Sequence, residues 1–400
     1  MIADAVGGIL LTSVTLYAVL GGADFGGGLW DLLAGGDRRG RAPRRLIDES
    51  ITPVWEANHV WLVFDLVIFW TAFPYAFAAV MTTAALPLWL ALLGIVLRGA
   101  GFAFRKEVRR LSLQRLLGAI FAFSSLMAPF FMGTVIGAIA TGQVPANASR
   151  ASLSAWTGTV PLLTGFLFVG ACGYLAAVYL VGEAARGGAA GLEAYFTRRA
   201  WASGIVTGAL SLAALAELHT SDLPLYDRLT GRALALVIVA ALFGVAVVAL
   251  LTFGRRGALV VTGARVLAAL GVAAVVWGWG VAQYPVLLPG TAVTLSNAGA
   301  PHTTLVALAG LFIVVVLVIG PSFALLFSLH GRRILRAGDG GTLSAATVGG
   351  THQLAGAPRQ QPPAGQRPGT RNRPGTRNMV LGLVAVAALV RAALRRRRGR

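Results

Sequence analysis

The chain has 400 residues, of which 56% are hydrophobic and only 12% are charged, and its mean hydropathy is +0.74. Soluble domains carry roughly 25% charged residues, so this composition excludes an ordinary soluble domain and predicts a multi-pass helical membrane protein. The net charge of +19 would fit a nucleic-acid partner, but the basic residues follow the loops between apolar segments, which favours membrane topology and anionic lipid instead.

Nine apolar segments each reach the roughly 20 residues that are needed to cross the hydrocarbon layer of a membrane. The expected fold is therefore all-α, a polytopic membrane protein with nine transmembrane helices. The predicted spans cover residues 5–34, 51–73, 75–99, 115–140, 156–183, 199–217, 233–253, 264–284 and 303–329.

Basic residues alternate between the two sides of this arrangement. Before the C-terminal tail, 17 Lys and Arg fall on one side and three on the other. Cytoplasmic loops carry the excess of Lys and Arg, so the N-terminus is expected outside and residue 331 in the cytoplasm.

The last part of the chain differs from the rest. Residues 1–336 are expected to form the membrane domain, and residues 337–400 a disordered basic cytoplasmic tail rich in Pro, Gly and Arg, with a direct repeat at 367–372 and 373–378. An apolar run at 379–390 is too short to span and is interpreted as an interfacial helix on anionic lipid or as loose tail.

Asp24 lies in the first predicted span, among the glycines of residues 21–28. Glycines let membrane helices approach closely, and a buried carboxyl needs a partner. Asp24 either forms a structural hydrogen bond to backbone or a tryptophan, or takes part in a proton path.

Residues 53–61 read Pro-Val-Trp-Glu-Ala-Asn-His-Val-Trp at the start of the second span. Glu56 and His59 are three apart and share a helix face, so they form either a protonatable pair or a polar cluster that fixes helix packing. If this helix begins near Ile47, Glu56 lies at a depth similar to that of Asp24. The same motif supplies Trp55, Asn58 and Trp61 as structural or interface candidates.

Three further polar residues are structural or interface candidates. Asp65 lies nine residues after Glu56, about 13 Å deeper and turned by about 180°, so it is expected to contact another helix or a partner subunit. Arg98 is expected to end the third span, where it either reaches the lipid headgroups or pairs with Asp24, Glu49 or Glu56. Arg105 follows in the next loop.

The histidines argue against a haem held by this chain alone, because a membrane b-type haem usually needs two axial His or Met ligands. Only His59 lies well inside a span. The single cysteine, Cys172, allows no internal disulfide and is expected to be a small buried residue. No metal site is predicted.

The chain resembles subunit II of the cytochrome bd-type quinol oxidases over roughly residues 5–330. The resemblance rests on four elements, of which the second is the most specific. They are Gly-Ala-Asp-Phe-Gly-Gly-Gly at 22–28, the motif at 53–61, Arg-Gly-Ala-Gly-Phe-Ala-Phe-Arg at 98–105, and Gln-Tyr-Pro-Val-Leu-Leu-Pro at 283–289.

This resemblance implies a nine-helix subunit in the bacterial cytoplasmic membrane, paired with a homologous subunit I and, in some members, with a small single-helix subunit. Subunit I would hold haem b, either with haem d or with b haems only, and the quinol site; the complex would oxidise quinol and reduce oxygen to water. Subunit II would supply part of a proton path through acids at Asp24 and Glu56, with His59 and Trp55 nearby, and in some members an oxygen route.

The chain departs from the family pattern at several positions. Ala103 and Asn297 stand where relatives often have an acid, and the Asn-His pair at 58–59 looks like the cyanide-insensitive branch. Two alternatives stay open: a secondary transporter, although no internal repeat supports it, and a scaffold that only stabilises subunit I.

Overall fold

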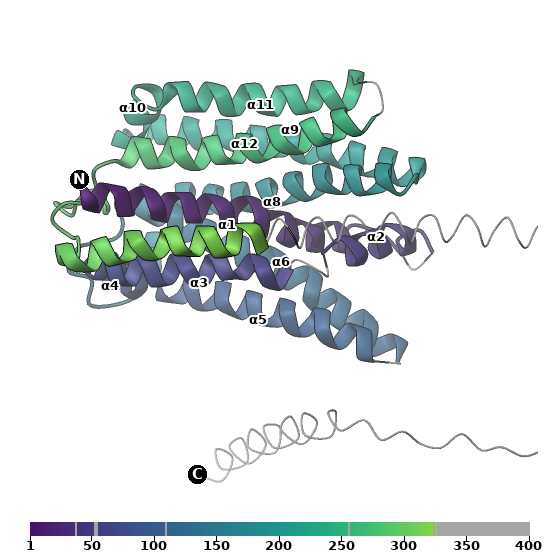
Figure 1. Cartoon of the computed structure of the whole chain (residues 1–400), viewed down its shortest axis with the longest axis horizontal. Coiled ribbons are helices and arrows are strands. Elements are labelled where there is room, and N and C mark those ends of the chain that lie inside the picture. Colours follow the sequence, from purple (N-terminus) through teal and green to yellow (C-terminus); the bar gives the residue numbers. More distant parts are fainter. Residues whose placement is uncertain (37, 52–54, 109, 255–256, 323–324, 326–400) are drawn as a thin grey trace, which may run out of the picture. The chain divides into compact units, whose positions relative to one another are not determined.

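The computed structural model describes residues 1–36, 38–51, 55–108, 110–254, 257–322 and 325, and their regular elements are helices (Figure 1). Eight of these helices are long and apolar enough to cross a membrane, or nine if the bent pair α3–α4 counts as one span. The all-α membrane fold predicted from sequence is thus confirmed. The long helices are α1 (Ile2–Leu32), α3 (Trp55–Ala72), α5 (Ala85–Glu107), α6 (Leu111–Ala140), α8 (Thr159–Arg186), α9 (Ala190–Thr220), α11 (Leu234–Phe253), α12 (Ala258–Gln283) and a last helix, His302–Ser322.

Four shorter helices connect them: α2 (Arg41–Ile51), α4 (Pro74–Thr83), α7 (Ser154–Thr157) and α10 (Pro224–Thr230). The break between α3 and α4 lies at Phe73, whose φ of −134° and ψ of 59° are not helical, and the helix axis bends there by 118°. Pro74 disfavours the helical conformation for the residue before it, which explains why the break falls at Phe73.

This break corrects the predicted third span. Residues 75–99 do not form one helix, because α4 ends at Thr83 and the long helix α5 runs from Ala85 to Glu107. Arg98 therefore lies inside α5 rather than at the end of a span, and Arg105 lies in the same helix rather than in a loop. The helix that carries Glu56 also begins at Trp55, not near Ile47, which belongs to α2.

Helix α1 packs against α3, α6, α8 and α12. Its glycines allow this close packing: a Cβ on Gly26 would lie 1.9 Å from the carbonyl oxygen of Cys172 in α8, and a Cβ on Gly28 would lie 2.2 Å from Cβ of Ser125 in α6. Cys172 is itself buried, with 8% of its surface exposed. The predicted role of the glycines, close helix approach, is what the structure shows.

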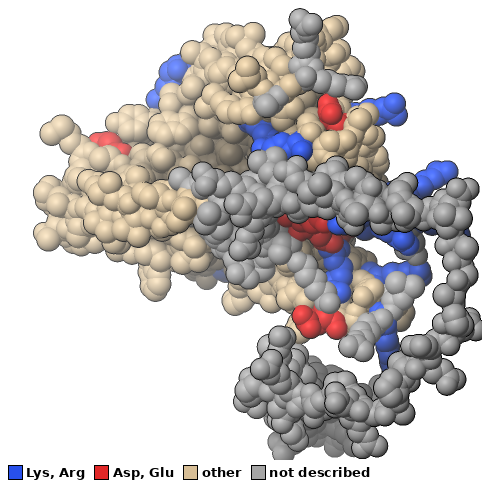
Figure 2. Space-filling view, turned by 45° about the vertical axis from the view of Figure 1, so that its right-hand side comes forward, with Lys and Arg blue, Asp and Glu red and all other residues tan. Residues whose placement is uncertain are grey.

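Charged side chains are unevenly distributed over the surface. Figure 2 shows most of the Lys and Arg side chains in the right-hand half of the view, whereas the left-hand part is dominated by uncharged residues. The amphipathic helix α2 buries Ile47 and exposes Arg45, whose Nε lies 2.7 Å from Oε1 of Glu49. The orientation of the chain in the membrane, with the N-terminus outside, stays a prediction.

The predicted tail, residues 337–400, and its apolar run at 379–390 lie outside the described residues. The division into a membrane domain at 1–336 and a tail therefore also stays a prediction.

Candidate functional site

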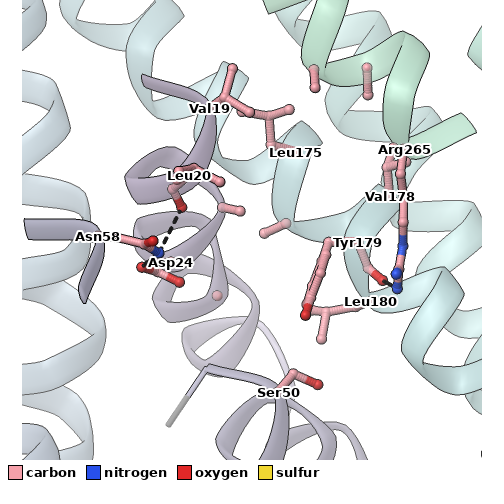
Figure 3. A pocket seen from close by; sticks show the side chains of 15 residues that line it. Val19, Leu20, Asp24, Ser50, Asn58, Leu175, Val178, Tyr179, Leu180 and Arg265 are labelled. Carbon is pink, nitrogen blue, oxygen red and sulfur yellow. Dashed lines mark hydrogen bonds between the residues drawn. The ribbon is translucent and has the colours of Figure 1, made fainter. Parts of the chain in front are cut away.

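A buried carboxyl of the first span forms the centre of the site. Asp24 in α1 is 4% exposed, and Asn58 in α3 is 2% exposed. The side-chain amide of Asn58 donates from Nδ2 to Oδ2 of Asp24 over 2.5 Å and to the carbonyl oxygen of Leu20 over 3.3 Å (Figure 3). One residue of the motif at 53–61 thereby fixes the acid of the glycine-rich segment in place.

A buried guanidinium lies beside this pair. Arg98 in α5 is 2% exposed, and its Cζ lies 4.8 Å from the ring centroid of Phe25 and 5.6 Å from that of Phe121. Arg98 is enclosed by protein and does not extend to the lipid headgroups. The carboxyl of Asp24, one of the three acids expected as partners, is close enough to interact electrostatically with Arg98. Aromatic faces stabilise a desolvated cation, so Phe25 and Phe121 help to hold Arg98 in the bundle.

His59 lies one position after Asn58 and is half-buried. Its ring packs edge-on against Tyr17 and Phe25 of α1, with centroids 6.1 Å and 5.9 Å apart. The motif at 53–61 therefore places the side chains of both Asn58 and His59 against α1. Trp61, 6% exposed, packs edge-on against Phe64.

Glu56 and Trp55 belong to α3, but their side chains lie outside the described part of the chain. The predicted pairing of Glu56 with His59 and the similar depth of Glu56 and Asp24 stay predictions. Asp65, 9% exposed, lies next to Ser13 of α1. This position beside α1 corresponds to one of the two roles expected for Asp65, contact with another helix or with a partner subunit.

A second charged cluster joins the ends of α1, α2 and α5. Asp31 is 4% exposed and accepts from Nε of Arg44 over 2.9 Å and from Nη1 of Arg105 over 2.6 Å. Arg105 also pairs with Asp48 of α2, and its Cζ lies 5.1 Å from the Phe121 ring centroid. Arg105 thus links α5 to α1 and α2, and lies in α5 rather than in a loop.

Sequence reasoning missed Asp31, although a signal for it existed. Asp31 follows Asp24 by seven residues, about two helical turns, and so falls on the same side of α1. Sequence reasoning also missed Glu183 of α8, whose Oε1 lies 3.0 Å from Nη2 of Arg265 in α12. These two residues are 82 positions apart, and no local pattern links them.

A cavity of about 170 Å³ adjoins Asp24. Figure 3 shows Asp24 and Asn58 on one side of it, and Tyr179 and Arg265 on the other. Leu20, Ala23, Leu175, Ala176, Ala268 and Ala269 contribute apolar lining, and Ser50 comes from the end of α2.

A comparison with known protein families shows to which family the chain belongs. The model of the family "cytochrome bd terminal oxidase subunit II" matches residues 3–330. The chain belongs to this family. The match includes every site residue described above, so the resemblance inferred from the four sequence elements is confirmed.

Two relatives match this subunit II family member over shorter stretches. The cytochrome bd ubiquinol oxidase subunit 2 of Bacillus subtilis (strain 168) is 30% identical over 127 residues, which cover 32% of this chain and 37% of the relative. The cytochrome bd-I ubiquinol oxidase subunit 2 of Escherichia coli (strain K12) is 28% identical over 186 residues, which cover 46% of this chain and 47% of the relative. The matched stretches thus span less than half the length of these relatives.

A solved structure shares the fold of this subunit II chain. The bd oxidase from Geobacillus thermodenitrificans matches with a TM-score of 0.66, covering 82% of this chain and 98% of that chain at 23% identity. At this identity the likeness establishes the fold alone. Among the described residues, no three His, Cys, Asp or Glu side chains gather as metal ligands would. The assignment of haems to a partner subunit stays a prediction.

Proposed function

We propose that this chain is the second subunit of a terminal quinol oxidase in a bacterial cytoplasmic membrane. In this proposal a homologous subunit I holds the haems and the quinol site, and the pair oxidises quinol and reduces oxygen to water. Membership of the subunit II family over residues 3–330 supports the proposal, as do relatives named as ubiquinol oxidase subunits.

Within that complex, we propose that Asp24 is part of a proton path. Reduction of oxygen to water consumes protons, and ionisable side chains inside a membrane are costly and often mark proton paths. The observation that carries this proposal is the burial of Asp24 in α1 with its carboxyl held by Asn58 of the motif at 53–61. Arg98 would stabilise the charge that is left when the proton leaves Asp24.

Glu56 and His59 complete the proposed path on α3. His59 lies one residue after Asn58 and packs against α1, the helix that carries Asp24, so a proton accepted on the α3 side has a titratable neighbour near Asp24. Trp55 and Trp61 would hold this end of α3 in place. Haem b, with or without haem d, would supply the redox chemistry from the partner subunit.

The test replaces carboxyls by amides of nearly the same shape. Asp24→Asn and Glu56→Gln, alone and together, are expected to lower oxygen consumption by about 100-fold, because positioned proton-transfer groups contribute factors of that order. Asp227→Asn in α10 is the matched control, since that acid is exposed. The haem spectrum of each purified complex reports whether assembly is intact.

A double variant with its full haem content and unchanged oxygen consumption would eliminate the proton path and leave the scaffold role. A haem-free chain that purifies without a second membrane subunit would overturn the oxidase assignment and favour a transporter.

For the rest of the chain, we propose that residues 1–336 form the membrane domain and residues 337–400 a basic tail on the cytoplasmic side. Fourteen Arg and one Asp in residues 331–400 support an interaction of the tail with anionic lipid.

A further inference from the structure

The cavity beside Asp24 has polar groups on opposite walls, and the rest of its lining is apolar. Asp24 and Asn58 line the wall formed by α1 and α3, and Tyr179 and Arg265 line the wall formed by α8 and α12 (Figure 3). A cavity can hold water where it is roomy enough and offers each water molecule two to four polar partners, and these four side chains are the candidate partners here.

We propose that this cavity holds a chain of water molecules that carries protons to Asp24 from the end of α2, within this subunit. The inference rests on the proposed proton role of Asp24 and adds a route to it. A volume of about 170 Å³ holds roughly five water molecules, at about 30 Å³ each.

Polar atoms at the cavity are available to such water molecules. Oδ1 of Asn58 and Nε of Arg265 are buried and have no hydrogen-bond partner among the residues that the structure describes. A buried amide oxygen or guanidinium N–H without a partner is costly, and water satisfies both. The carboxyl of Asp24 and the hydroxyl of Ser50 add further acceptors.

Arg265 is fixed in position against α8. Its Nη2 donates to Oε1 of Glu183 over 3.0 Å, and its Cζ lies 4.4 Å from the ring centroid of Tyr179. Gly182 leaves room for the guanidinium, since a Cβ there would lie 2.3 Å from Nη2 of Arg265. Glu183 also reduces the positive charge at this wall, which would otherwise repel an excess proton.

The α2 end of the cavity is the proposed entrance. Ser50 lies in the last turn of α2, and Arg44 near the start of that helix is tied to Asp31 of α1, two turns beyond Asp24. The clamp between Arg44 and Asp31 therefore sets where α2 lies relative to the acid. In the predicted orientation this is the cytoplasmic side, from which protons are drawn.

Cysteine accessibility tests this proposal directly, because Cys172 is the chain's single cysteine. The assembled complex carries Cys172→Ala, together with either Ala268→Cys, which lines the cavity, or Ala264→Cys as the matched control. Ala264 lies one turn away on α12, is 1% exposed and does not line the cavity. Inverted membrane vesicles are treated with 2-aminoethyl methanethiosulfonate, a small cationic thiol reagent, and labelling of this chain is followed by mass spectrometry.

We expect position 268 to be labelled at least about tenfold faster than position 264, because a dry buried site reacts only through local opening. Oxygen consumption should fall as labelling at position 268 proceeds. Equal labelling at both positions overturns the proposal, as does labelling of position 268 by lipid-soluble N-phenylmaleimide but not by the cationic reagent, which would mean an apolar occupant. Labelling without loss of oxygen consumption overturns the proton route.

If the Ala268→Cys complex does not assemble, Ala269→Cys provides the same comparison, since Ala269 also lines the cavity. The labelling rate does not depend on the acid at position 24. A dry cavity together with low oxygen consumption in Asp24→Asn would therefore contradict the water route alone. A wet cavity together with full oxygen consumption in Asp24→Asn would contradict the proposed function.

Discussion

Asn58 donates a hydrogen bond to the carboxyl of Asp24 over 2.5 Å, and the two residues are 34 positions apart in the sequence. This bond joins two of the four sequence elements on which the family resemblance rests, the glycine-rich segment of α1 and the motif at the start of α3. Asn58 therefore links two helices and fixes the acid at the proposed proton site at the same time.

Replacement of Asn58 by leucine should weaken the assembled complex. Asn58→Leu keeps the approximate shape but leaves Oδ2 of Asp24 without this donor, and a buried polar group that loses its partner costs about 1–3 kcal/mol. We expect a lower thermal denaturation midpoint and lower oxygen consumption. Asn147→Leu, at an exposed position, is the control. Equal midpoints for the two variants would show that the bond contributes nothing to stability.

The close contact of α1 and α8 predicts a strong effect of one added methyl group. In Gly26→Ala the new Cβ would meet the carbonyl oxygen of Cys172 at 1.9 Å, so the helices must separate. Overpacking of this kind costs about 1–3 kcal/mol. Gly8→Ala in the same helix is the control, because nothing lies within 4 Å of its added Cβ. The yield of haem-bearing complex is the measurement, and similar yields would contradict the packing that we describe.

The buried cluster of Asp31, Arg44 and Arg105 should contribute more to the stability of the complex than the exposed ion pair of Arg45 and Glu49. Asp31→Asn removes the charge that Arg44 and Arg105 share, and breaking a buried pair costs about 3–5 kcal/mol, with less expected here because Arg44 is about a third exposed. Glu49→Gln breaks the exposed pair with Arg45 and is expected to change nothing measurable. Thermal denaturation of the two complexes decides between them; a larger loss in Glu49→Gln would reverse the expected order.

The orientation of the chain can be tested with two cysteines at exposed positions. In a Cys172→Ala background, Gly36→Cys should react with a membrane-impermeant thiol reagent in inverted vesicles but not in intact cells. Asn147→Cys should show the opposite behaviour, because the positive-inside rule places it outside. A reversed pattern would place the N-terminus in the cytoplasm.

Several features of the site were predictable because they depend on local sequence. Asp24 and the motif at 53–61 are conspicuous, since polar residues are rare in apolar segments, and the break before Pro74 follows from the conformation that proline imposes on Phe73. The start of α5 at Ala85 was not predictable, because residues 75–97 carry no charged residue, and Thr82 and Thr83 are of a type that also occurs inside membrane helices.

The sequence by itself determined that this is an all-helical membrane chain of the subunit II family, because hydrophobic length and a specific motif are local properties. Only the tertiary structure decided which residues surround Asp24. Asn58 of α3 and Arg98 of α5 lie beside it, and Arg265 of α12 lies across the cavity; these distant segments come together through helix packing, including the close approaches at Gly26 and Gly182. The physical reason is that contacts between helices depend on the depth and the rotation of each helix in the bundle. The sequence of a single helix does not specify either quantity.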